Sequence, residues 1–285
     1  MECVPNFSEG RDHNIIEGVV RAIGAAGGAI LDRTADGDHN RCVVTFAGSP
    51  EAIAEAALAG VAEAVAKIDL TRHVGVHPRV GAADVVPFVP VTGVTLEECA
   101  RIAEHVGKRI WRELRVPVFL YEAAARSPGR VRLENIRLGA DGMQPDFGEK
   151  PHPTAGVTIV GARKFLIAWN INLATNRLEA ARQIARKIRF SSGGLPCVKA
   201  LGLSLASRNQ VQVSMNLIDF EQTPLHVVFD AVAAEARERG IAIAGSELIG
   251  LIPAKALQLS AGHDLQWENF RADMILENRL AATMK

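Results

Sequence analysis

The sequence predicts an α/β (α+β) fold made of two ferredoxin-like units, each with its elements in the order βαββαβ. Apolar residues switch along the chain between a period of two and a period of about 3.6, which indicates strands alternating with helices. The same order of elements recurs in the second half, where Thr223-Pro224 opens a helix as Ser49-Pro50 does in the first. With 285 residues, the chain is long enough to bury two hydrophobic cores.

The first half contains the first βαββαβ series. Strands are predicted at residues 2–6, 29–32, 42–46 and 84–89, and helices at residues 12–26 and 49–68. Gly27 and Gly28 end the first helix. Turn formers fill residues 35–40, so the second and third strands should form a hairpin with a long polar tip. This tip is either solvated or turned toward a ligand, and it lacks the twelve-residue pattern of a calcium loop.

An additional helix and strand are predicted between the halves. The capping box from Thr95 to Glu98 opens the helix, and residues 116–121 form the strand. Residues 126–156 are rich in glycine, proline and charge and have only weak periodicity. We expect this segment to be functional or mobile, because its backbone polar groups need water or a ligand as partners.

The second half repeats the order of the first. Strands are predicted at residues 165–173, 198–205, 211–217 and 241–244, and helices at residues 175–189 and from Thr223 to Gly240. The chain beyond about residue 253 is predicted to be helical and to pack onto the second unit. We therefore divide the chain into two domains, residues 1–163 and residues 164–285.

The composition excludes several classes of protein. Lys and Arg number 32, Asp and Glu number 32, and the pI is about 7.1, so there is no overall attraction to nucleic acid. The amino terminus lacks the basic start and apolar run of a secretory signal. No later apolar stretch reaches the roughly 18 to 20 residues that a membrane span needs. We expect a cytoplasmic protein with neither nucleic acid nor membrane as a partner.

The cysteines and glycine runs exclude further chemistry. The cysteines are scattered and include no Cys-x-x-Cys pair, so neither a zinc site nor a disulfide framework is predicted. Each cysteine is expected to be a small apolar core residue. The four are Cys3, Cys42, Cys99 and Cys197. The glycine runs match neither the dinucleotide-binding nor the P-loop pattern, which disfavours nucleotide chemistry.

The histidine with the most informative setting is His77, in the segment 73–81 that leads into the predicted strand at residues 84–89. A loop histidine at a strand entrance both accepts and donates protons near neutral pH. Pro78 fixes the backbone beside the imidazole and Arg79 places a guanidinium next to it. The alternative is an exposed or structural histidine. His73, four residues earlier, does not form a metal site with His77, because glycine and proline oppose a helix there, and no metal is predicted.

Several short sequence motifs, here called strings, occur one after another along the chain. They are residues 2–10, Asn40-Arg41, residues 75–81 with Asp84 and Pro87-Phe88, residues 145–148, residues 161–173 and residues 245–253. On these strings the chain resembles the formiminotransferase domain of glutamate formiminotransferases, which occurs alone or fused to a cyclodeaminase. The resemblance covers essentially the whole chain, and the cyclodeaminase part is not seen before Lys285.

The resemblance implies transfer of a formimino group between N-formimino-L-glutamate and N5 of tetrahydrofolate, a late step of histidine degradation. It implies that His77 is the catalytic histidine. It assigns folate binding to the segment after the Pro145 string, namely Gly148, Glu149, Lys150, Pro151, His152, Pro153, Thr154, Ala155 and Gly156. It further implies two subdomains whose mixed sheets face each other across a ligand tunnel with the helices outside, a homodimer, polyglutamylated tetrahydrofolate as co-substrate, and a separate cyclodeaminase as a possible partner.

The reaction requires residue types that the sequence supplies. N5 attacks the formimino carbon, and the resulting tetrahedral intermediate loses one proton and delivers one to the departing glutamate amine, which a single imidazole can do. Both substrates carry glutamate carboxylates, which need fixed cationic donors. Candidates are Arg41, beside Asn40, and Arg79, Arg163 and Lys164. Asp84 is either a carboxylate that stabilises the cationic donor or orients His77, or an exposed acid at a strand end.

Two other functions remain possible on the sequence. The donor could be a formyl group, carried from 5-formyltetrahydrofolate to glutamate on the same fold. The protein could also bind folate without catalysis. The intact His77 string argues against a binding protein without activity.

Overall fold

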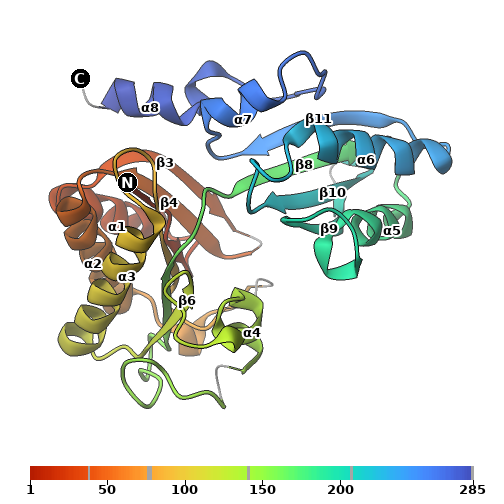
Figure 1. Cartoon of the computed structure of the whole chain (residues 1–285). Coiled ribbons are helices and arrows are strands. Elements are labelled where there is room, and N and C mark those ends of the chain that lie inside the picture. The colour runs from red at the N-terminus through yellow and green to blue at the C-terminus, as the bar shows by residue number, and fades with distance from the viewer. Residues whose placement is uncertain (38, 76–78, 140–141, 206–207, 284–285) are drawn as a thin grey trace. The chain divides into compact units, whose positions relative to one another are not determined.

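The computed structural model describes residues 1–37, 39–75, 79–139, 142–205 and 208–283. The chain forms two compact units, residues Met1–Lys164 and residues Phe165–Thr283 (Figure 1). Each unit has its own sheet and its own hydrophobic core. No helix among the described residues combines the length and apolar character needed to cross a bilayer. The two-sheet α/β architecture predicted from the sequence is confirmed.

The sheet of the first unit has seven strands. They are β1 (Glu2–Cys3), β2 (Asn6–Phe7), β3 (Ala29–Asp36), β4 (Arg41–Ala47), β5 (Ala83–Val89), β6 (Val118–Glu122) and β7 (Thr158–Ala162). Both β1 and β2 pair with β4 and β5, so they are two parts of one strand interrupted at Pro5, which has no N–H to donate. The spatial order β3, β4, β1/β2, β5 is the ferredoxin-like arrangement of a βαββαβ series.

Two parallel strands extend this sheet beyond β5. The order continues β5, β7, β6, and β7 runs parallel to both neighbours. The helix α3 (Leu96–Arg109) makes the crossover from β5 to β6. The sequence did not reveal β7. Its five residues are all buried, and a strand buried on both faces shows no alternation of polar and apolar residues.

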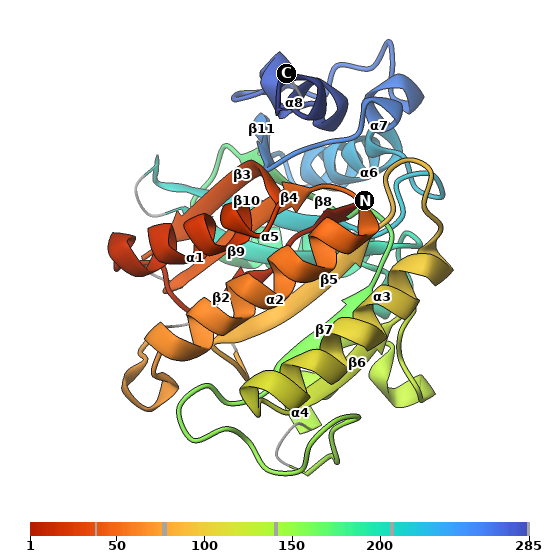
Figure 2. The same ribbon diagram turned by 90° about the vertical axis from the view of Figure 1, so that its left-hand side faces the viewer.

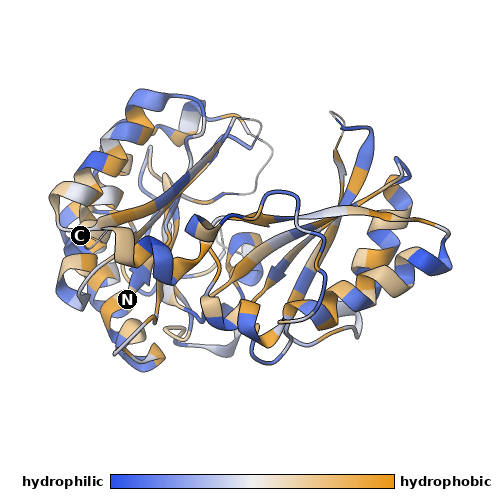
Figure 3. Cartoon of the chain, turned by 90° about the horizontal axis from the view of Figure 1, so that it is seen from above, coloured by the Kyte–Doolittle hydropathy of each residue, from blue (hydrophilic) through white to orange (hydrophobic). Residues whose placement is uncertain are grey.

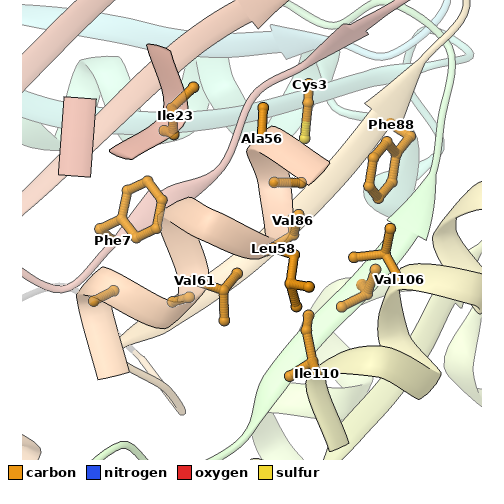
Figure 4. Packing of buried hydrophobic residues seen from close by; sticks show 14 of the residues in the cluster. Cys3, Phe7, Ile23, Ala56, Leu58, Val61, Val86, Phe88, Val106 and Ile110 are labelled. Carbon is orange, nitrogen blue, oxygen red and sulfur yellow. The ribbon is translucent and has the colours of Figure 1, made fainter. Parts of the chain in front are cut away.

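Three helices cover one face of the first sheet (Figure 2): α1 (His13–Ala25), α2 (Pro50–Lys67) and α3. Their starts are capped as the sequence predicts, by Asp12, by Ser49 and by the Thr95–Glu98 capping box. Apolar residues from all three helices pack with alternate residues of the strands (Figure 4). Among them are Phe7, Ile23, Val61, Phe88 and Val106.

The opposite face carries the short helix α4 (Leu133–Gly139) near β5, β6 and β7. Ile136 of α4 is fully buried and packs with Phe119, Tyr121 and Ile159 of the strands. Residues 126–156, whose periodicity in the sequence is weak, therefore contain a packed helix that the sequence did not reveal. A helix of seven residues is too short to show a clear periodicity in the sequence.

The sheet of the second unit has four strands, β8 (Ile167–Leu173), β9 (Val198–Leu205), β10 (Gln210–Leu217) and β11 (Ile243–Ile249). Their order is β11, β8, β10, β9 and every pair is antiparallel, which is again ferredoxin-like. The prediction of a mixed sheet is correct for the first unit and wrong for the second, because the second lacks a parallel extension. That the sheets face each other across a tunnel stays a prediction.

Helices of the second unit pack on one face of its sheet. The helices α5 (Leu178–Ile188) and α6 (Leu225–Glu238) share a core with β8 and β10. The predicted helical tail is confirmed in part: α7 (Ala254–Leu259) and α8 (Leu276–Thr283) are helical, whereas residues 260–275 between them contain no α-helix. Hydrophobic and hydrophilic segments alternate along the helices (Figure 3), as expected of helices with one buried side. Shorter turns are a π-helical turn at Ile110–Leu114 and 3₁₀ turns at Leu70–Arg72, Pro128–Arg130, Phe190–Ser192 and Ala272–Met274.

The cysteines are all free thiols, and three of the four are buried in the core as predicted. Cys197 is the exception. It is only partly buried, has a φ of 58°, and its Sγ lies 3.0 Å from Oε1 of Gln222. The prediction of a core cysteine is wrong at this position, because Cys197 lies in the turn before β9.

Candidate functional site

Asn40 ties together three loops at one end of the first sheet. Its side chain is buried, its Oδ1 accepts a hydrogen bond from the amide of Gly10 at 2.9 Å, and its Nδ2 donates to the carbonyl of Val74 at 3.1 Å. Its φ of 49° is a left-handed conformation that asparagine tolerates better than most residues. The β3–β4 hairpin is thereby fixed to the segment that leads into residues 76–78.

His73 and Arg79 flank that segment. The guanidinium of Arg79 lies against the imidazole of His73 and donates to the carbonyls of His39 and Asn40, at 3.0 and 3.3 Å. Burial, and then the neighbouring Arg79, lower the pKa of His73, so this imidazole is neutral at pH 7. His77 itself lies outside the described residues.

Asp84 is a buried acid that fixes the start of β5. It is 1% exposed, its Oδ1 accepts the amide of Val80 at 2.8 Å, and its Oδ2 pairs with Nη2 of Arg137 on α4. The interpretation of Asp84 as an exposed acid at a strand end is therefore wrong. Sequence reasoning did not identify Arg137, which is 53 residues from its partner.

Arg41 lies near the charges of Asp84 and Arg137, and both affect the pKa of its guanidinium. Burial is the main cause that lowers the pKa of its guanidinium, Arg137 lowers it further, and Asp84 and Asp36 oppose the shift. The structure therefore brings four candidates, Asn40, Arg41, Arg79 and Asp84, to the loops on either side of residues 76–78. We call this group the loop cluster.

The segment assigned to folate binding lies partly alongside the loop cluster. The amide of Ala82 donates to the carbonyl of Ala155 at 2.9 Å, and the amide of Val157 donates to the carbonyl of Val80 at 2.9 Å. A Cβ on Gly81 would lie 1.9 Å from the carbonyl oxygen of Val157, so only glycine permits this approach. The residues near 155 are thus hydrogen-bonded to the residues just before β5, which Asp84 holds in place.

His152 shapes the turn in this segment. It exchanges two backbone hydrogen bonds with Gly156, at 2.8 and 3.0 Å, and its Nδ1 accepts the amide of Ala155 at 3.1 Å. Because Nδ1 is an acceptor, a neutral His152 carries its proton on Nε2. Ala155 is buried and Gly148 packs against the ring of Trp111. The exposed members of the segment are Glu149, Lys150, Pro151 and Pro153, and the partly buried ones include Thr154.

Arg163 and Lys164 lie at the other end of the sheet. The amide of Arg163 donates to the carbonyl of Phe88 at 3.0 Å, at the carboxyl end of β5, whereas Asp84 lies at the amino end of that strand. The two positions are four residues apart along β5, which corresponds to about 13 Å. The predicted cations therefore form two groups: Arg41 and Arg79 in the loop cluster, and Arg163 with Lys164 beyond β7.

A second buried acid pairs with a second arginine from the segment before α4. The carboxylate of Asp146 accepts the amide of Leu120 at 2.8 Å and pairs with Nη1 of Arg130 at 2.7 Å. Asp146 belongs to the 145–148 string that carried the family resemblance, so its role in this string is to fix the chain beside β6. Sequence reasoning assigned it no contact.

An open cavity of about 540 Å³ lies elsewhere, between α2 and α3. None of the predicted residues lines it. Two of its carboxylates already have partners, because Glu98 caps α3 and Glu55 pairs with Arg109. We therefore place the candidate site at the loop cluster. Within the described ranges, no three His, Cys, Asp or Glu side chains are grouped to hold a metal ion.

The fold and these contacts define a two-unit α/β protein in which the loop cluster, with Arg79 against the imidazole of His73, lies at one end of the first sheet. Residues 1–163 match the formiminotransferase domain, N-terminal subdomain, and residues 168–281 match the formiminotransferase domain. The chain belongs to the formiminotransferase family.

Individual relatives extend over the same length. The chain is 46% identical to a glutamate formimidoyltransferase of Streptococcus pyogenes, with 98% of each chain covered. It is 41% identical to a glutamate formimidoyltransferase of Thermoplasma acidophilum, over 100% of this chain and 99% of the relative. A formimidoyltransferase-cyclodeaminase of Sus scrofa is 44% identical over 94% of this chain, which matches 53% of that longer relative.

Proposed function

We propose that the protein is a folate-dependent glutamate formimidoyltransferase, which moves the formimino group between N-formimino-L-glutamate and N5 of tetrahydrofolate during histidine degradation. The observation that carries this proposal is the 46% identity, over 98% of both chains, to a relative with that name. The loop cluster supports it independently, because it supplies cations and fixes the start of β5, beside the sequence string that contains His77.

His77 is the general acid and base of the proposed reaction. N5 of the reduced pterin forms a bond to the formimino carbon, and His77 takes the proton that the attacking nitrogen then releases. The bond from carbon to the glutamate nitrogen breaks as His77 returns a proton to that nitrogen, so the imidazole ends in its starting state. Asp84 holds the amide of Val80 and so fixes the strand just after the histidine.

The loop cluster also supplies groups for the charged substrates. The guanidinium groups of Arg41 and Arg79 are the proposed partners of glutamate carboxylates at this end of the sheet, because a guanidinium binds a carboxylate through two parallel hydrogen bonds. Asn40 holds the hairpin that carries Arg41. Arg163 and Lys164 are the proposed partners of carboxylates at the opposite end.

The folate segment is proposed to be residues 148–156. Support comes from its position, since Ala155 and Val157 are hydrogen-bonded to the strand entrance, and from the exposed side chains of Glu149 and Lys150. Tetrahydrofolate is a co-substrate, its polyglutamylated form is the proposed cellular species, and no metal takes part in the proposal.

The broader organisation is proposed on the family resemblance. Residues 1–163 are the N-terminal subdomain with the catalytic histidine, and residues 164–285 are the C-terminal subdomain. The protein works in the cytoplasm as a homodimer and passes its product to a separate cyclodeaminase.

Steady-state turnover with tetrahydrofolate tests the proposal. We expect the purified protein to use the formimino donor, and His77→Ala to reduce kcat by at least about a hundredfold while folate affinity changes little. Near-normal turnover by His77→Ala would remove the role of His77. Preference for a formyl donor in the same assay would favour the formyl reaction, and folate binding without turnover of either donor would favour a binding protein.

A further inference from the structure

The tip of the β3–β4 hairpin contains a pair of side chains, Asp36 and His39, to which the proposed reaction gives no role. Nδ1 of His39 lies 2.7 Å from Oδ2 of Asp36, and the amide of His39 donates to Oδ1 of the same carboxylate at 2.8 Å. Both side chains are about half exposed, so a ligand can reach them. On the sequence alone this tip is either solvated or turned toward a ligand, and its contacts favour the second reading.

The backbone of His39 is tied to the string that contains His77. Nη2 of Arg79 donates to the carbonyl of His39 at 3.0 Å, and a Cβ on Gly75 would lie 2.6 Å from that same carbonyl oxygen. The described residues on both sides of residues 76–78 therefore lie against His39. Within the tip, Nε of Arg11 donates to the carbonyl of Gly37 at 2.7 Å. The pair of Asp36 and His39 is thus fixed beside the string of the proposed catalytic histidine.

The carboxylate of Asp36 sets which nitrogen of His39 carries the proton. An ionised carboxylate only accepts hydrogen bonds, so in a neutral His39 the proton is on Nδ1 and Nε2 is an acceptor. An acceptor nitrogen with a carboxylate behind it favours a ligand that donates an N–H and carries a positive charge. It disfavours a ligand oxygen that only accepts, because the lone pairs of the two atoms then face each other.

The formimino group is a ligand of the favoured kind. In its protonated form it is a cation whose terminal nitrogen carries N–H donors, whereas the formyl group of N-formyl-L-glutamate has an acceptor oxygen at that position. In the donor molecule, the α-carboxylate and the formimino group are attached to the same carbon, so the residues that bind them must be neighbours. Arg79, a proposed partner of glutamate carboxylates, is hydrogen-bonded to His39 itself.

We propose that His39 is a specificity-determining residue whose Nε2 accepts a hydrogen bond from the terminal nitrogen of the formimino group, and that Asp36 is the positioning residue that orients its imidazole. This inference rests on the proposed function, since that function supplies the formimino donor. Arg79 binds the α-carboxylate of the same donor molecule. His77 keeps its role in proton transfer, because the terminal nitrogen that His39 contacts neither attacks nor leaves during the reaction.

The experiment compares the KM for N-formimino-L-glutamate with the Ki for N-formyl-L-glutamate, which has an oxygen in place of the terminal nitrogen, at about pH 8, where an ordinary imidazole is neutral. We expect the wild type to favour the formimino compound by about tenfold or more, and His39→Phe to abolish this preference mainly by raising KM. Arg79→Met should weaken both compounds by similar factors, since both carry the α-carboxylate. His105→Phe, at an exposed histidine on α3, is the control and should change neither constant.

A second variant, Asp36→Asn, tests the orientation of the imidazole. The new amide can donate to Nδ1, which moves the proton of His39 to Nε2 and turns that nitrogen into a donor. Asp36→Asn should therefore raise the KM for the formimino compound and lower the Ki for the formyl compound, whereas a merely structural role would weaken both alike and overturn the inference. Equal affinity of the wild type for the two compounds, or a preference that persists in His39→Phe, would also overturn it. Wild-type protein with no formimino transfer at all would overturn the proposed function instead.

Discussion

The two units bury different kinds of polar side chain. In the first, buried acids lie beside arginines: Asp84 with Arg137, Asp146 with Arg130, and Glu2 near Arg163. In the second, no acidic residue among the described ones is fully buried, and the sheet carries amides instead. They are Asn170, Asn172 and Gln212.

This difference matters because a carboxylate and an amide respond differently to their surroundings. A buried carboxylate changes its charge with pH and needs a nearby cation, whereas an amide stays neutral. The first unit, which also carries the histidine string, is therefore the one whose stability and chemistry should depend on pH and on charge. The second should tolerate changes to its buried polar groups.

The largest effect is expected at Asp84. Asp84→Asn keeps an oxygen for the amide of Val80 but leaves Arg137 charged, 18% exposed and without its partner. Removing one member of a buried ion pair destabilises a protein by about 3 kcal/mol or more, and urea unfolding would measure it. The matched control is Asp273→Asn in the second unit, an exposed acid paired with Arg271, where we expect a change below about 0.5 kcal/mol.

A double variant tests whether the loss of stability comes from the broken ion pair between Asp84 and Arg137. If the loss in Asp84→Asn comes from the uncompensated charge, adding Arg137→Met should recover about half of it or more. Losses that simply add would mean that the two side chains stabilise the fold independently of each other.

The next effect is the pH dependence of stability due to Glu2. Its pKa is about 7 in the folded protein and near 4.5 when exposed, so the folded state holds the proton more strongly. The stability that this proton contributes is fully present below about pH 4.5 and is lost as the pH rises toward 7, by roughly 3 kcal/mol. Comparison of the free energy of unfolding of the wild type and Glu2→Gln at pH 5 and pH 8 should show this difference. Parallel curves would mean that Glu2 is not buried as a titrating acid.

Gly161 should show a smaller effect. Gly161→Ala places a Cβ 2.3 Å from the backbone oxygen of Tyr121, and overpacking of this kind destabilises by about 1 to 3 kcal/mol. Gly24→Ala is the control, because no atom lies within 4 Å of the added Cβ and alanine favours the helix. Thermal unfolding should separate the two, and an unchanged melting temperature in Gly161→Ala would contradict the close approach of Tyr121.

The sequence predicted most of the secondary structure because local signals produce it. The helix starts at Asp12, Ser49 and Thr95 are marked by capping residues, and amphipathic periodicity marks the helices that follow. It did not predict β7, which is buried on both faces, or α4, which is only seven residues long. In both cases the deciding interactions come from distant parts of the chain.

The sequence predicted those residues of the site that lie in recognisable sequence strings. Asn40, Arg41, Arg79 and Asp84 were identified from such strings, and the structure brings them to the same loops. Arg137 was not, since its pairing with Asp84 joins residues 53 positions apart and leaves no local pattern. The burial of Glu2 is likewise a consequence of tertiary packing.

The smallest effect is expected in the second unit, at Gln212. Its side chain is 8% exposed, its Oε1 has no partner among the described residues, and it lies directly across from Asn172, whose Oδ1 also has none. Gln212→Met removes an amide that makes little use of its oxygen and keeps the shape of the side chain, so the free energy of unfolding should change by less than about 1 kcal/mol. The stability of this variant should also have the same pH dependence as that of the wild type. A loss above about 2 kcal/mol in urea unfolding would show that the amide has a partner, and that the second sheet depends on its buried polar groups as strongly as the first.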